Sequence, residues 1–447
     1  MGKYFGTDGI RGIANTELTP ELAFKVARAS ANKLDNGHKK LIIIGKDTRK
    51  SGDLLESALV SGYTSMGFDV YLLGVIPTPA VAYLTRYYNA AAGIVISASH
   101  NPAEFNGIKY FGPNGFKLPD EVEDEIEELM DNYKSIELRP TGVEIGIVER
   151  KEDAKDIYIK FLESIVNVDL TGKKIALDCG NGATFDIAAK LFEDLGAKVE
   201  AISTNPNGMN INDKCGSTNP ELASELVKKI GADIGFTFDG DGDRLITIDE
   251  NGDILDGDHF LAACAYHMKN KGTLKNNGIV GTVMTNIGLD EYAKSINIEV
   301  KKANVGDRYV LELMVDGGYN LGGEQSGHII FLDNNTTGDG MLSALKIAET
   351  MVESGKKMSE LNNLMVTYPQ VLVNAKVKNE NKNSFMEDEV ISREVKKLED
   401  TFNGEGRVLI RPSGTEPLVR VMIEGKNQKV LEEEANRLAS IIEERLS

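Results

Sequence analysis

Short apolar runs and longer amphipathic stretches alternate along the chain as far as Pro369. Hydrophobic runs without polar interruption are typical of strands buried on both faces of a parallel sheet. The stretches between them carry apolar residues at helical spacing. Several begin with a cap residue, a proline and an acid, as in Thr19-Pro20-Glu21 and Asn219-Pro220-Glu221. This alternation predicts βαβ units with a parallel sheet in each.

The alternation occurs three times, and each of the three units ends in a different polar loop. The predicted strands are residues 41–44, 70–73, 93–96, 174–177, 198–202, 233–238, 279–283, 298–303 and 319–321. In an open parallel sheet, ligands bind outside the carboxyl ends of the strands. Three repeats of one architecture therefore present three loops at equivalent positions.

The pattern changes after Pro369. Residues 371–377 and 407–411 are predicted strands, and residues 419–424 alternate between apolar and polar positions. A terminal helix is predicted from about residue 429 to residue 445. Strands grouped in this way indicate a small α+β domain.

Composition narrows the class of protein. Of the 447 residues, 41% are hydrophobic and 27% are charged, as in an ordinary globular protein. The net charge of −19 disfavours nucleic acid and anionic membranes as partners. Three scattered cysteines, Cys179, Cys215 and Cys264, argue against a disulfide framework or a zinc site. With no apolar run of membrane-spanning length and no signal-peptide core, we expect a cytoplasmic protein.

Residues 93–109 (GIVISASHNPAEFNGIK) join a predicted buried strand to a loop with reactive side chains. The loop carries the hydroxyl of Ser99, the imidazole of His100 and the amine of Lys109. An exposed serine at this position can act as a nucleophile if its neighbours activate it. The alternative is a turn whose Ser and Asn side chains bond their own backbone. This stretch alone leaves both interpretations open.

The segment DGDGDR places Asp239, Asp241 and Asp243 at alternate positions, with glycines between them. Three neighbouring carboxylates suit Mg²⁺ or Ca²⁺, which prefer oxygen ligands. An EF-hand is the specific alternative, with Glu250 at its twelfth position. Arg244 stands where that loop requires glycine, and a predicted strand precedes it. We therefore favour Mg²⁺ in an enzyme, with a solvated acidic turn as the remaining alternative.

Three further loops are weak signals when each is taken alone. GGEQSGH offers Glu324, Ser326 and His328, a mixture of donors and acceptors that suits sugar hydroxyls. RPSGTEP, residues 411–417, combines an arginine, two hydroxyls and a glycine, as in an anion-binding turn. FGTDGIRG places Arg11 on a glycine-rich backbone. The chain has neither of the glycine-rich motifs that bind nucleotide phosphates.

The four loops SASHNP, DGDGDR, GEQSGH and RPSGTEP together resemble the α-D-phosphohexomutase family, over essentially the whole chain. GTDGIRG, LTPELAF and VGDRYV are most similar to the bacterial members that act on glucosamine phosphate. The resemblance implies four domains around a central cleft. Three are similar α/β domains with mixed or mostly parallel sheets, and the fourth is α+β. The expected boundaries are 1–153, 154–253, 254–367 and 368–447.

The resemblance also implies a reaction, the interconversion of glucosamine 6-phosphate and glucosamine 1-phosphate through a phosphoserine and a bisphosphorylated sugar. The implied catalytic residues are Ser99, His100, Lys109, Arg11, Arg244 and His328. The implied ligands of one Mg²⁺ per chain are Ser99, Asp239, Asp241 and Asp243. The implied substrate-binding residues are Glu324, Ser326, Arg411, Ser413, Gly414 and Thr415. Lys109 is expected to move the hydroxyl proton, with His328 as a second candidate.

The expected partner is a phosphosugar, with a bisphosphorylated hexose or an unidentified kinase to prime Ser99. A homodimer stays open. The nearest rival is a phosphomannomutase or phosphoglucomutase with the same machinery and another sugar preference. A rival from a different class is a non-catalytic protein that binds Ca²⁺ or a sugar phosphate.

Overall fold

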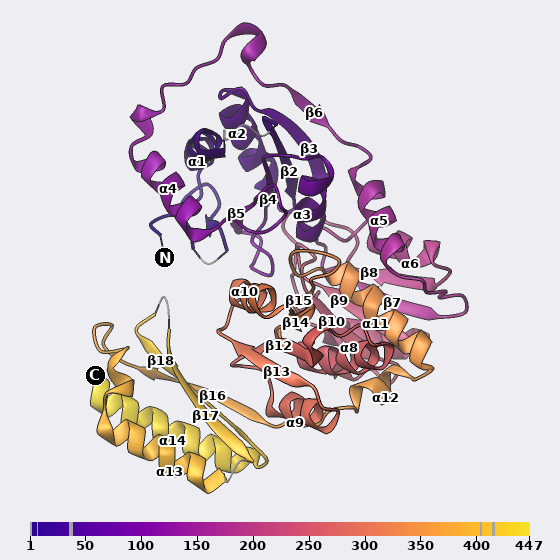
Figure 1. Cartoon of the computed structure of the whole chain (residues 1–447), viewed down its shortest axis with the longest axis vertical. Coiled ribbons are helices and arrows are strands. Elements are labelled where there is room, and N and C mark those ends of the chain that lie inside the picture. Colours follow the sequence, from indigo (N-terminus) through magenta and orange to yellow (C-terminus); the bar gives the residue numbers. More distant parts are fainter. Residues whose placement is uncertain (1, 7, 35–38, 403–404, 414–415) are drawn as a thin grey trace. The chain divides into compact units, whose positions relative to one another are not determined.

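The computed structural model describes residues 2–6, 8–34, 39–402, 405–413 and 416–447. The chain forms two compact units (Figure 1). The large unit comprises Met1–Thr285 and Ile296–Leu364, and the C-terminal unit comprises Asn286–Ser295 and Met365–Ser447. The described residues of the large unit build three sheets, and those of the C-terminal unit build one.

The first sheet has the strand order β1-β5-β4-β2-β3-β6. Its strands are β1 (Ile10–Ile13), β2 (Leu41–Lys46), β3 (Asp69–Val75), β4 (Ala92–Ile96), β5 (Phe105–Phe111) and β6 (Val148–Arg150). Its helices are α1 (Pro20–Leu34), α2 (Gly52–Thr64), α3 (Thr78–Tyr87) and α4 (Asp120–Asp131), with short 3₁₀ turns η1 (Tyr133–Ser135) and η2 (Gly142–Glu144). Strands β4, β2, β3 and β6 are parallel, whereas β5 runs antiparallel to both β4 and β1.

The two faces of strand β2 show why this sheet is covered on both sides. Ile42 and Ile44 are fully buried in a core that they share with residues of α1, α2 and α4. Gly45 belongs to the opposite face, where a Cβ atom would lie 2.6 Å from Val81 of α3. Side chains alternate across a strand, so an uninterrupted apolar run needs helices on both faces.

The second sheet has the order β11-β10-β9-β7-β8, and the third has the order β13-β12-β14-β15. The second contains β7 (Lys174–Asp178), β8 (Lys198–Ile202), β9 (Ile234–Phe238), β10 (Leu245–Asp249) and β11 (Ile254–Leu255), with α5 (Ala154–Ile165), α6 (Ala188–Asp194) and α7 (Glu221–Ile230). The third contains β12 (Gly278–Thr282), β13 (Glu299–Ala303), β14 (Leu321–Gly323) and β15 (Ile329–Phe331), with α8 (Gly257–Lys271), η3 (Lys275–Asn277), α10 (Asp307–Gly317), α11 (Gly340–Ser354) and α12 (Met358–Asn362).

The C-terminal unit is an antiparallel sheet of order β16-β18-β17 with its own apolar core. Its elements are β16 (Gln370–Lys376), η4 (Ser384–Met386), α13 (Glu389–Phe402), β17 (Gly406–Pro412), β18 (Leu418–Gly425) and α14 (Gln428–Leu446). Helix α9 (Ile287–Ser295) also belongs to this unit, although it precedes β13 in the chain. It is tied there by the backbone N–H of Ile287, which donates to Glu424 Oε1 at 2.9 Å.

The predicted class, three α/β domains and a C-terminal α+β domain, is confirmed. Each sheet of the large unit has parallel strands at its centre and an antiparallel strand beside them. The sequence interpretation missed these antiparallel strands. In particular, residues 105–111 form β5 rather than part of a loop, so Lys109 projects from a strand.

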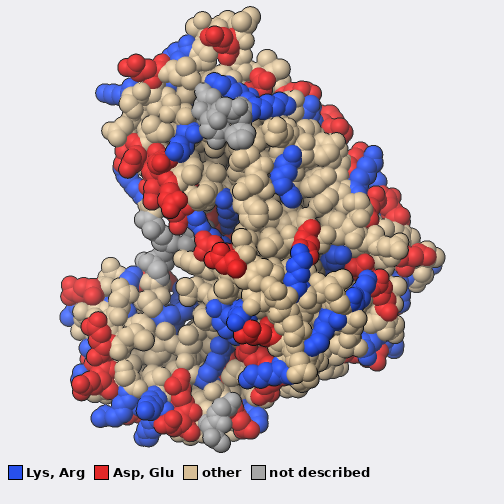
Figure 2. All heavy atoms as spheres, in the orientation of Figure 1, with Lys and Arg blue, Asp and Glu red and all other residues tan. Residues whose placement is uncertain are grey.

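On the face in Figure 2, acidic and basic side chains are interspersed over the surface. The three cysteines are buried, and none of them forms a disulfide within the described part of the chain. Among the described helices, none combines the length and hydrophobicity needed to cross a lipid bilayer.

Candidate active site

Ser99 lies in the loop that follows β4, at the carboxyl end of the first sheet's central strands. Its Oγ donates a hydrogen bond to Asp239 Oδ2 at 2.6 Å and lies 3.3 Å from His100 Nδ1. The residue is only 2% exposed, so the predicted exposed serine is in fact recessed. The second sheet supplies its partner, because Asp239 follows β9.

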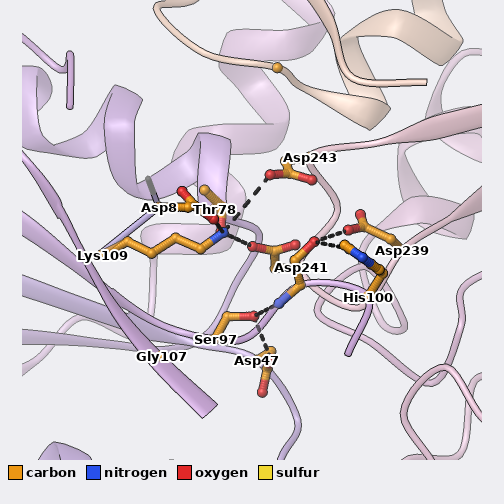
Figure 3. Close-up of polar contacts among 12 residues, drawn as sticks. Asp8, Asp47, Thr78, Ser97, His100, Gly107, Lys109, Asp239, Asp241 and Asp243 are labelled. Atoms are coloured by element: carbon orange, nitrogen blue, oxygen red, sulfur yellow. Dashed lines mark hydrogen bonds and ion pairs between the residues drawn. The ribbon is translucent and has the colours of Figure 1, made fainter. Parts of the chain in front are cut away.

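The three predicted metal ligands do converge. One oxygen from each of Asp239, Asp241 and Asp243 lies within 4.8 Å of the others, and all three residues are buried. Figure 3 shows this cluster beside Lys109, with Thr78 and His100 at its margins. Burial, and then the charges of the other two carboxylates, raise the pKa of Asp239 well above its ordinary value.

The residues present fit a divalent cation. Among the described residues, Asp241 Oδ1 and Asp243 Oδ1 are buried without a hydrogen-bond partner. Buried carboxylate oxygens are normally satisfied, and an oxygen-only donor set is what Mg²⁺ and Ca²⁺ prefer. The EF-hand alternative is wrong, because strands β9 and β10 flank the loop and Glu250 accepts hydrogen bonds from Ser359 instead.

A closed ring of alternating acidic and basic side chains adjoins the carboxylate cluster. In order, its members are Asp8, Lys109, Asp243, His328, Asp307 and Lys117. Lys109 Nζ lies 3.1 Å from Asp8 and 4.0 Å from Asp243. Lys117 Nζ lies 2.6 Å from Asp8 and 2.5 Å from Asp307. His328 completes the ring, 3.6 Å from Asp243 and 3.7 Å from Asp307.

Lys109 is held as a cation in this ring. Its Nζ donates to Asp241 Oδ2 at 2.9 Å. Burial opposes the charge of Lys109, but the carboxylates of Asp241, Asp8 and Asp243 outweigh it and raise the pKa. An ammonium group cannot accept a proton, so the structure favours a role for Lys109 as counter-ion or proton donor.

The two histidines of the site have opposite electrostatic environments. Burial, helped by the charges of Arg244 and Arg11, lowers the pKa of His100 to about 4. For His328, burial acts in the same direction, but the hydrogen bond and charge of Asp243 raise the pKa overall. The backbone N–H of Gly338 donates to His328 Nε2 at 3.1 Å, which places the proton of the neutral imidazole on Nδ1.

A cavity of about 610 Å³ opens over these groups. Eight of the predicted site residues line it: Arg11, Ser99, His100, Asp243, Arg244, Glu324, Ser326 and His328. They come from all three sheets of the large unit, which confirms that the loops meet. Glu324 is oriented by the backbone N–H of Gly306, which donates to its Oε1 at 3.0 Å. Arg11 lies on strand β1 and forms an ion pair with Asp8.

The predicted phosphate loop belongs to the C-terminal unit. Arg411 stands opposite Arg420 in the pairing of β17 with β18, and burial together with the charge of Arg420 lowers the pKa of Arg411. Ser413 is buried, and its Oγ accepts from the backbone N–H of Glu416 at 3.2 Å. Two adjacent guanidinium groups suit an anion. Gly414 and Thr415 lie outside the described residues.

Sequence interpretation named the loops but missed several residues of the site. Asp8 lies in FGTDGIRG and Asp307 in VGDRYV, both named above, whereas Asp47 follows β2 and Lys117 follows the turn at residues 112–115. Asp8 and Asp307 form ion pairs with lysines from another part of the chain, whereas Asp47 pairs with nearby Arg49. Arg420 could have been found in the sequence by asking which residue of the next strand faces Arg411 across the hairpin.

Comparison with known proteins places the chain in a family. It matches the phosphoglucomutase/phosphomannomutase family in four segments: α/β/α domain I at residues 2–137, domain II at 156–252, domain III at 256–368 and the C-terminal domain at 372–441. The chain belongs to the phosphoglucomutase/phosphomannomutase family, the phosphohexomutases, and the resemblance inferred from the loops is confirmed.

Within this family, one relative is the phosphoglucosamine mutase of Finegoldia magna, 62% identical over 100% of this chain and 99% of its own length. A solved family member from Burkholderia thailandensis superposes with a TM-score of 0.81 at 22% identity, covering 100% of this chain and 99% of that one. The N-acetylphosphoglucosamine mutase of Aspergillus fumigatus, solved in complex with GlcNAc-6P and magnesium, gives a TM-score of 0.68 at 17% identity, covering 99% and 96%. These two structures support the fold.

Proposed function

We propose that this phosphohexomutase interconverts glucosamine 6-phosphate and glucosamine 1-phosphate through a phosphoserine at Ser99. The observation that carries the proposal is the hydrogen bond of 2.6 Å between Ser99 Oγ and Asp239. It joins a hydroxyl that can carry a phosphoryl group to the carboxylate cluster, and Ser99 lines a cavity of about 610 Å³. The sequence identity of 62% with the phosphoglucosamine mutase of Finegoldia magna supports glucosamine as the sugar.

The reaction consists of two transfers in opposite directions. In the first, the bond between phosphorus and Ser99 Oγ breaks, a bond to the free sugar oxygen forms, and the sugar hydroxyl loses its proton. The resulting bisphosphorylated sugar turns within the cavity. In the second, its other phosphoryl group returns to Ser99 Oγ, and the released sugar oxygen regains a proton. Such transfers depend mainly on in-line positioning and charge neutralisation.

We assign the metal to Asp239, Asp241, Asp243 and the oxygen carried by Ser99, and we propose Mg²⁺. When bound, the cation supplies neutralisation of the charge that develops on the transferring phosphoryl oxygens. The protein supplies the matching positive groups. Arg11, Arg244 and Lys109 lie around the cluster, where they can hold the same oxygens.

We assign the role of proton acceptor to the histidines rather than to Lys109. His100 has a pKa of about 4, so its imidazole is neutral near pH 7 and can accept the proton of the sugar hydroxyl; its Nδ1 lies 3.3 Å from Ser99 Oγ. In the second transfer, Lys109 can donate a proton to the released sugar oxygen and regain the one that His100 accepted, so both groups end the cycle in their starting protonation states. His328 stays a second candidate, because it lines the same cavity.

Substrate binding is divided between two loops. Glu324 and Ser326 line the cavity and offer acceptor and donor groups for ring hydroxyls. In the C-terminal unit, Arg411, Ser413, Gly414 and Thr415 would bind the phosphate that is not being transferred. One fixed anion site serves both orientations of the sugar.

The priming of Ser99, by a bisphosphorylated hexose or a kinase, stays a prediction, as does a homodimer. A cytoplasmic location is also part of the proposal. It is supported by the odd number of cysteines and by the burial of all three thiols, which suits a reducing compartment.

The decisive experiment measures the intact mass of the purified protein and its turnover, with Ser99→Ala beside Ser326→Ala. We expect wild type and Ser326→Ala to carry one phosphate that Ser99→Ala lacks. Turnover should be abolished in Ser99→Ala but only reduced in Ser326→Ala. Near-normal turnover by Ser99→Ala would reject the phosphoserine role.

Sugar preference is tested by kcat/KM on the 6-phosphates of glucosamine, glucose and mannose. The proposal expects the highest value for glucosamine 6-phosphate. A higher value for mannose or glucose 6-phosphate would favour the phosphomannomutase or phosphoglucomutase alternative.

A further inference from the structure

The backbone at Ser99 adopts a conformation that serine does not favour. Its φ is 52°, in the left-handed region that suits glycine. A strained residue persists only where its surroundings over-determine it, and such residues cluster at functional sites. The contacts that hold this loop therefore bear on how the nucleophile is aimed.

A single arginine, in the loop between β2 and α2, makes three of these contacts. Arg49 is 3% exposed, and its Nη2 donates to the carbonyl oxygens of Ser99 at 2.9 Å and Asn101 at 2.8 Å. Its Nη1 donates to the carbonyl oxygen of Pro102. The planar guanidinium thus holds three carbonyls of one turn in fixed relative positions.

The other side of the same turn is held through Asp47. Arg49 Nε donates to Asp47 Oδ2 at 2.9 Å, and both side chains of this ion pair are fully buried. Ser97 Oγ donates to the same Asp47 oxygen at 2.5 Å and accepts from the backbone N–H of Ser99 at 2.9 Å. Figure 3 shows the link from Asp47 to Ser97 below the carboxylate cluster. Asp47 therefore orients Arg49 and, through Ser97, the amide of the nucleophile.

We propose that Arg49, oriented by Asp47, is a positioning residue that holds the backbone of Ser99 in its left-handed conformation and so aims Oγ at the phosphoryl group. Arg49 gives and receives no proton and does not touch the reacting atoms. The inference rests on the proposed phosphoserine mechanism.

Two transfers in opposite directions require more accurate placement of Ser99 Oγ than a single transfer would. Ser99 Oγ must present phosphorus to one sugar oxygen and then receive phosphorus from the opposite orientation. A displacement of about 1 Å can cost about 100-fold in rate, because in-line geometry is lost. Asn212 contributes from the second sheet's side, donating from Nδ2 to the Ser99 carbonyl at 2.9 Å. Both donors converge on the same oxygen.

The test compares Arg49→Lys with Arg28→Lys. Arg28 is a matched control, since it is also fully buried in the first domain and donates to two backbone carbonyls, those of Ile136 and Leu138. Lysine keeps the charge but replaces the planar fork with a single point donor. We expect Arg49→Lys to lower kcat by about 10- to 100-fold with KM within threefold of wild type. Arg28→Lys should keep kcat within threefold.

A second readout separates positioning from general destabilisation. The rate at which a bisphosphorylated hexose phosphorylates Ser99, followed by intact mass, should fall in Arg49→Lys by the same factor as kcat. The melting temperature should fall no more than in Arg28→Lys. If Arg49→Lys does not fold, Ser97→Ala provides the test, because it removes one hydroxyl and should also lower kcat with little effect on KM.

Two results would overturn the inference: wild-type kcat in a folded Arg49→Lys or Ser97→Ala protein, or an equal loss of kcat in Arg28→Lys. Both differ from failure of the proposed function, in which the wild-type protein itself would carry no phosphate on Ser99 during turnover.

Discussion

The buried carboxyl group of Asp339 caps a helix, and its ionisation makes the free energy of unfolding depend on pH. It caps helix α11, accepting from the backbone N–H of Leu342 at 2.9 Å and from the hydroxyl of Tyr158 at 2.8 Å. Burial raises its pKa to about 6 despite these hydrogen bonds. The folded protein therefore holds a proton on Asp339 at pH values where the unfolded chain, with a pKa near 3.8, has released it.

The raised pKa of Asp339 makes the protein less stable as the pH rises. As pH rises from about 4 to above 6, ionisation of Asp339 lowers the free energy of unfolding. We predict that Asp339→Asn, which keeps a good helix cap, gains about 2 kcal/mol relative to wild type between pH 4.5 and pH 8. Urea unfolding at both pH values measures this gain.

The matched control is another helix cap with the opposite shift. Asp256 caps α8, and although burial opposes ionisation, its hydrogen bond with the side chain of His259 lowers its pKa overall. Asp256→Asn should therefore lose stability at pH 8, with the loss disappearing only as pH falls below about 4. A gain in both variants would contradict the burial argument.

At this same scale, the sequence identified residue types better than residue partners. Ser99, Asp239 and Glu324 could be recognised because each belongs to a short motif whose chemistry is local. Asp47 and Arg49 could not, because their function depends on groups that a different loop brings to them: the Ser97 hydroxyl for Asp47 and three backbone carbonyls for Arg49. Contacts between residues that are far apart in the chain cannot be predicted from a local sequence motif.

Among the secondary-structure elements, helix α11 packs against the loop that carries Asp239, Asp241 and Asp243. The backbone N–H of Gly340, the first residue of the helix, donates to the carbonyl of Gly242 at 2.9 Å. A Cβ atom at Gly340 would lie 2.6 Å from the carbonyl oxygen of Arg244 and 3.0 Å from that of Gly242. The helix can approach the loop this closely only because residue 340 has no side chain.

We predict that Gly340→Ala moves α11 away from the loop, weakens divalent-metal binding about tenfold or more, and destabilises the protein by about 1 to 3 kcal/mol. Metal titration by calorimetry and urea unfolding measure the two effects. Gly52→Ala is the control, since Gly52 also begins a helix but its Cβ would come closest, at 3.2 Å, to the flexible side chain of Lys46 and no nearer than 3.9 Å to backbone. Unchanged metal affinity in Gly340→Ala would show that this contact does not shape the loop.

In the large unit, element prediction identified the buried parallel strands and missed the antiparallel ones, whereas the antiparallel strands of the C-terminal unit were predicted. Strand β4 (AGIVI) and the first four residues of β2 (LIII) are uninterrupted apolar runs, which are typical of strands buried on both faces. Strand β5 reads as a loop, because its sequence FNGIKYF contains a turn-like Asn-Gly pair and a lysine. The buried lysine is tolerated there because Asp241 and Asp8 neutralise it, a fact visible only in three dimensions.

On the scale of the whole molecule, the large unit concentrates unfavourable charge where its three sheets meet. Asp239, Asp241 and Asp243 are all buried, and the ring through Lys109 and Lys117 offsets only part of their repulsion. All three carboxylates belong to the large unit. A cation bound at the cluster should therefore stabilise one unit and leave the other unchanged.

This asymmetry is measurable by hydrogen exchange followed by mass spectrometry, with and without Mg²⁺. A ligand at 100 times its Kd stabilises the folded state by about 2.7 kcal/mol. We predict slower exchange in β9 and β10, no change in β16–β18, and loss of turnover in excess chelator. In Asp241→Asn, which removes one carboxylate and its repulsion, Mg²⁺ should no longer slow exchange in β9 and β10. Equal protection by Mg²⁺ in wild type and Asp241→Asn, or full turnover in chelator, would show that the three carboxylates do not form the metal site.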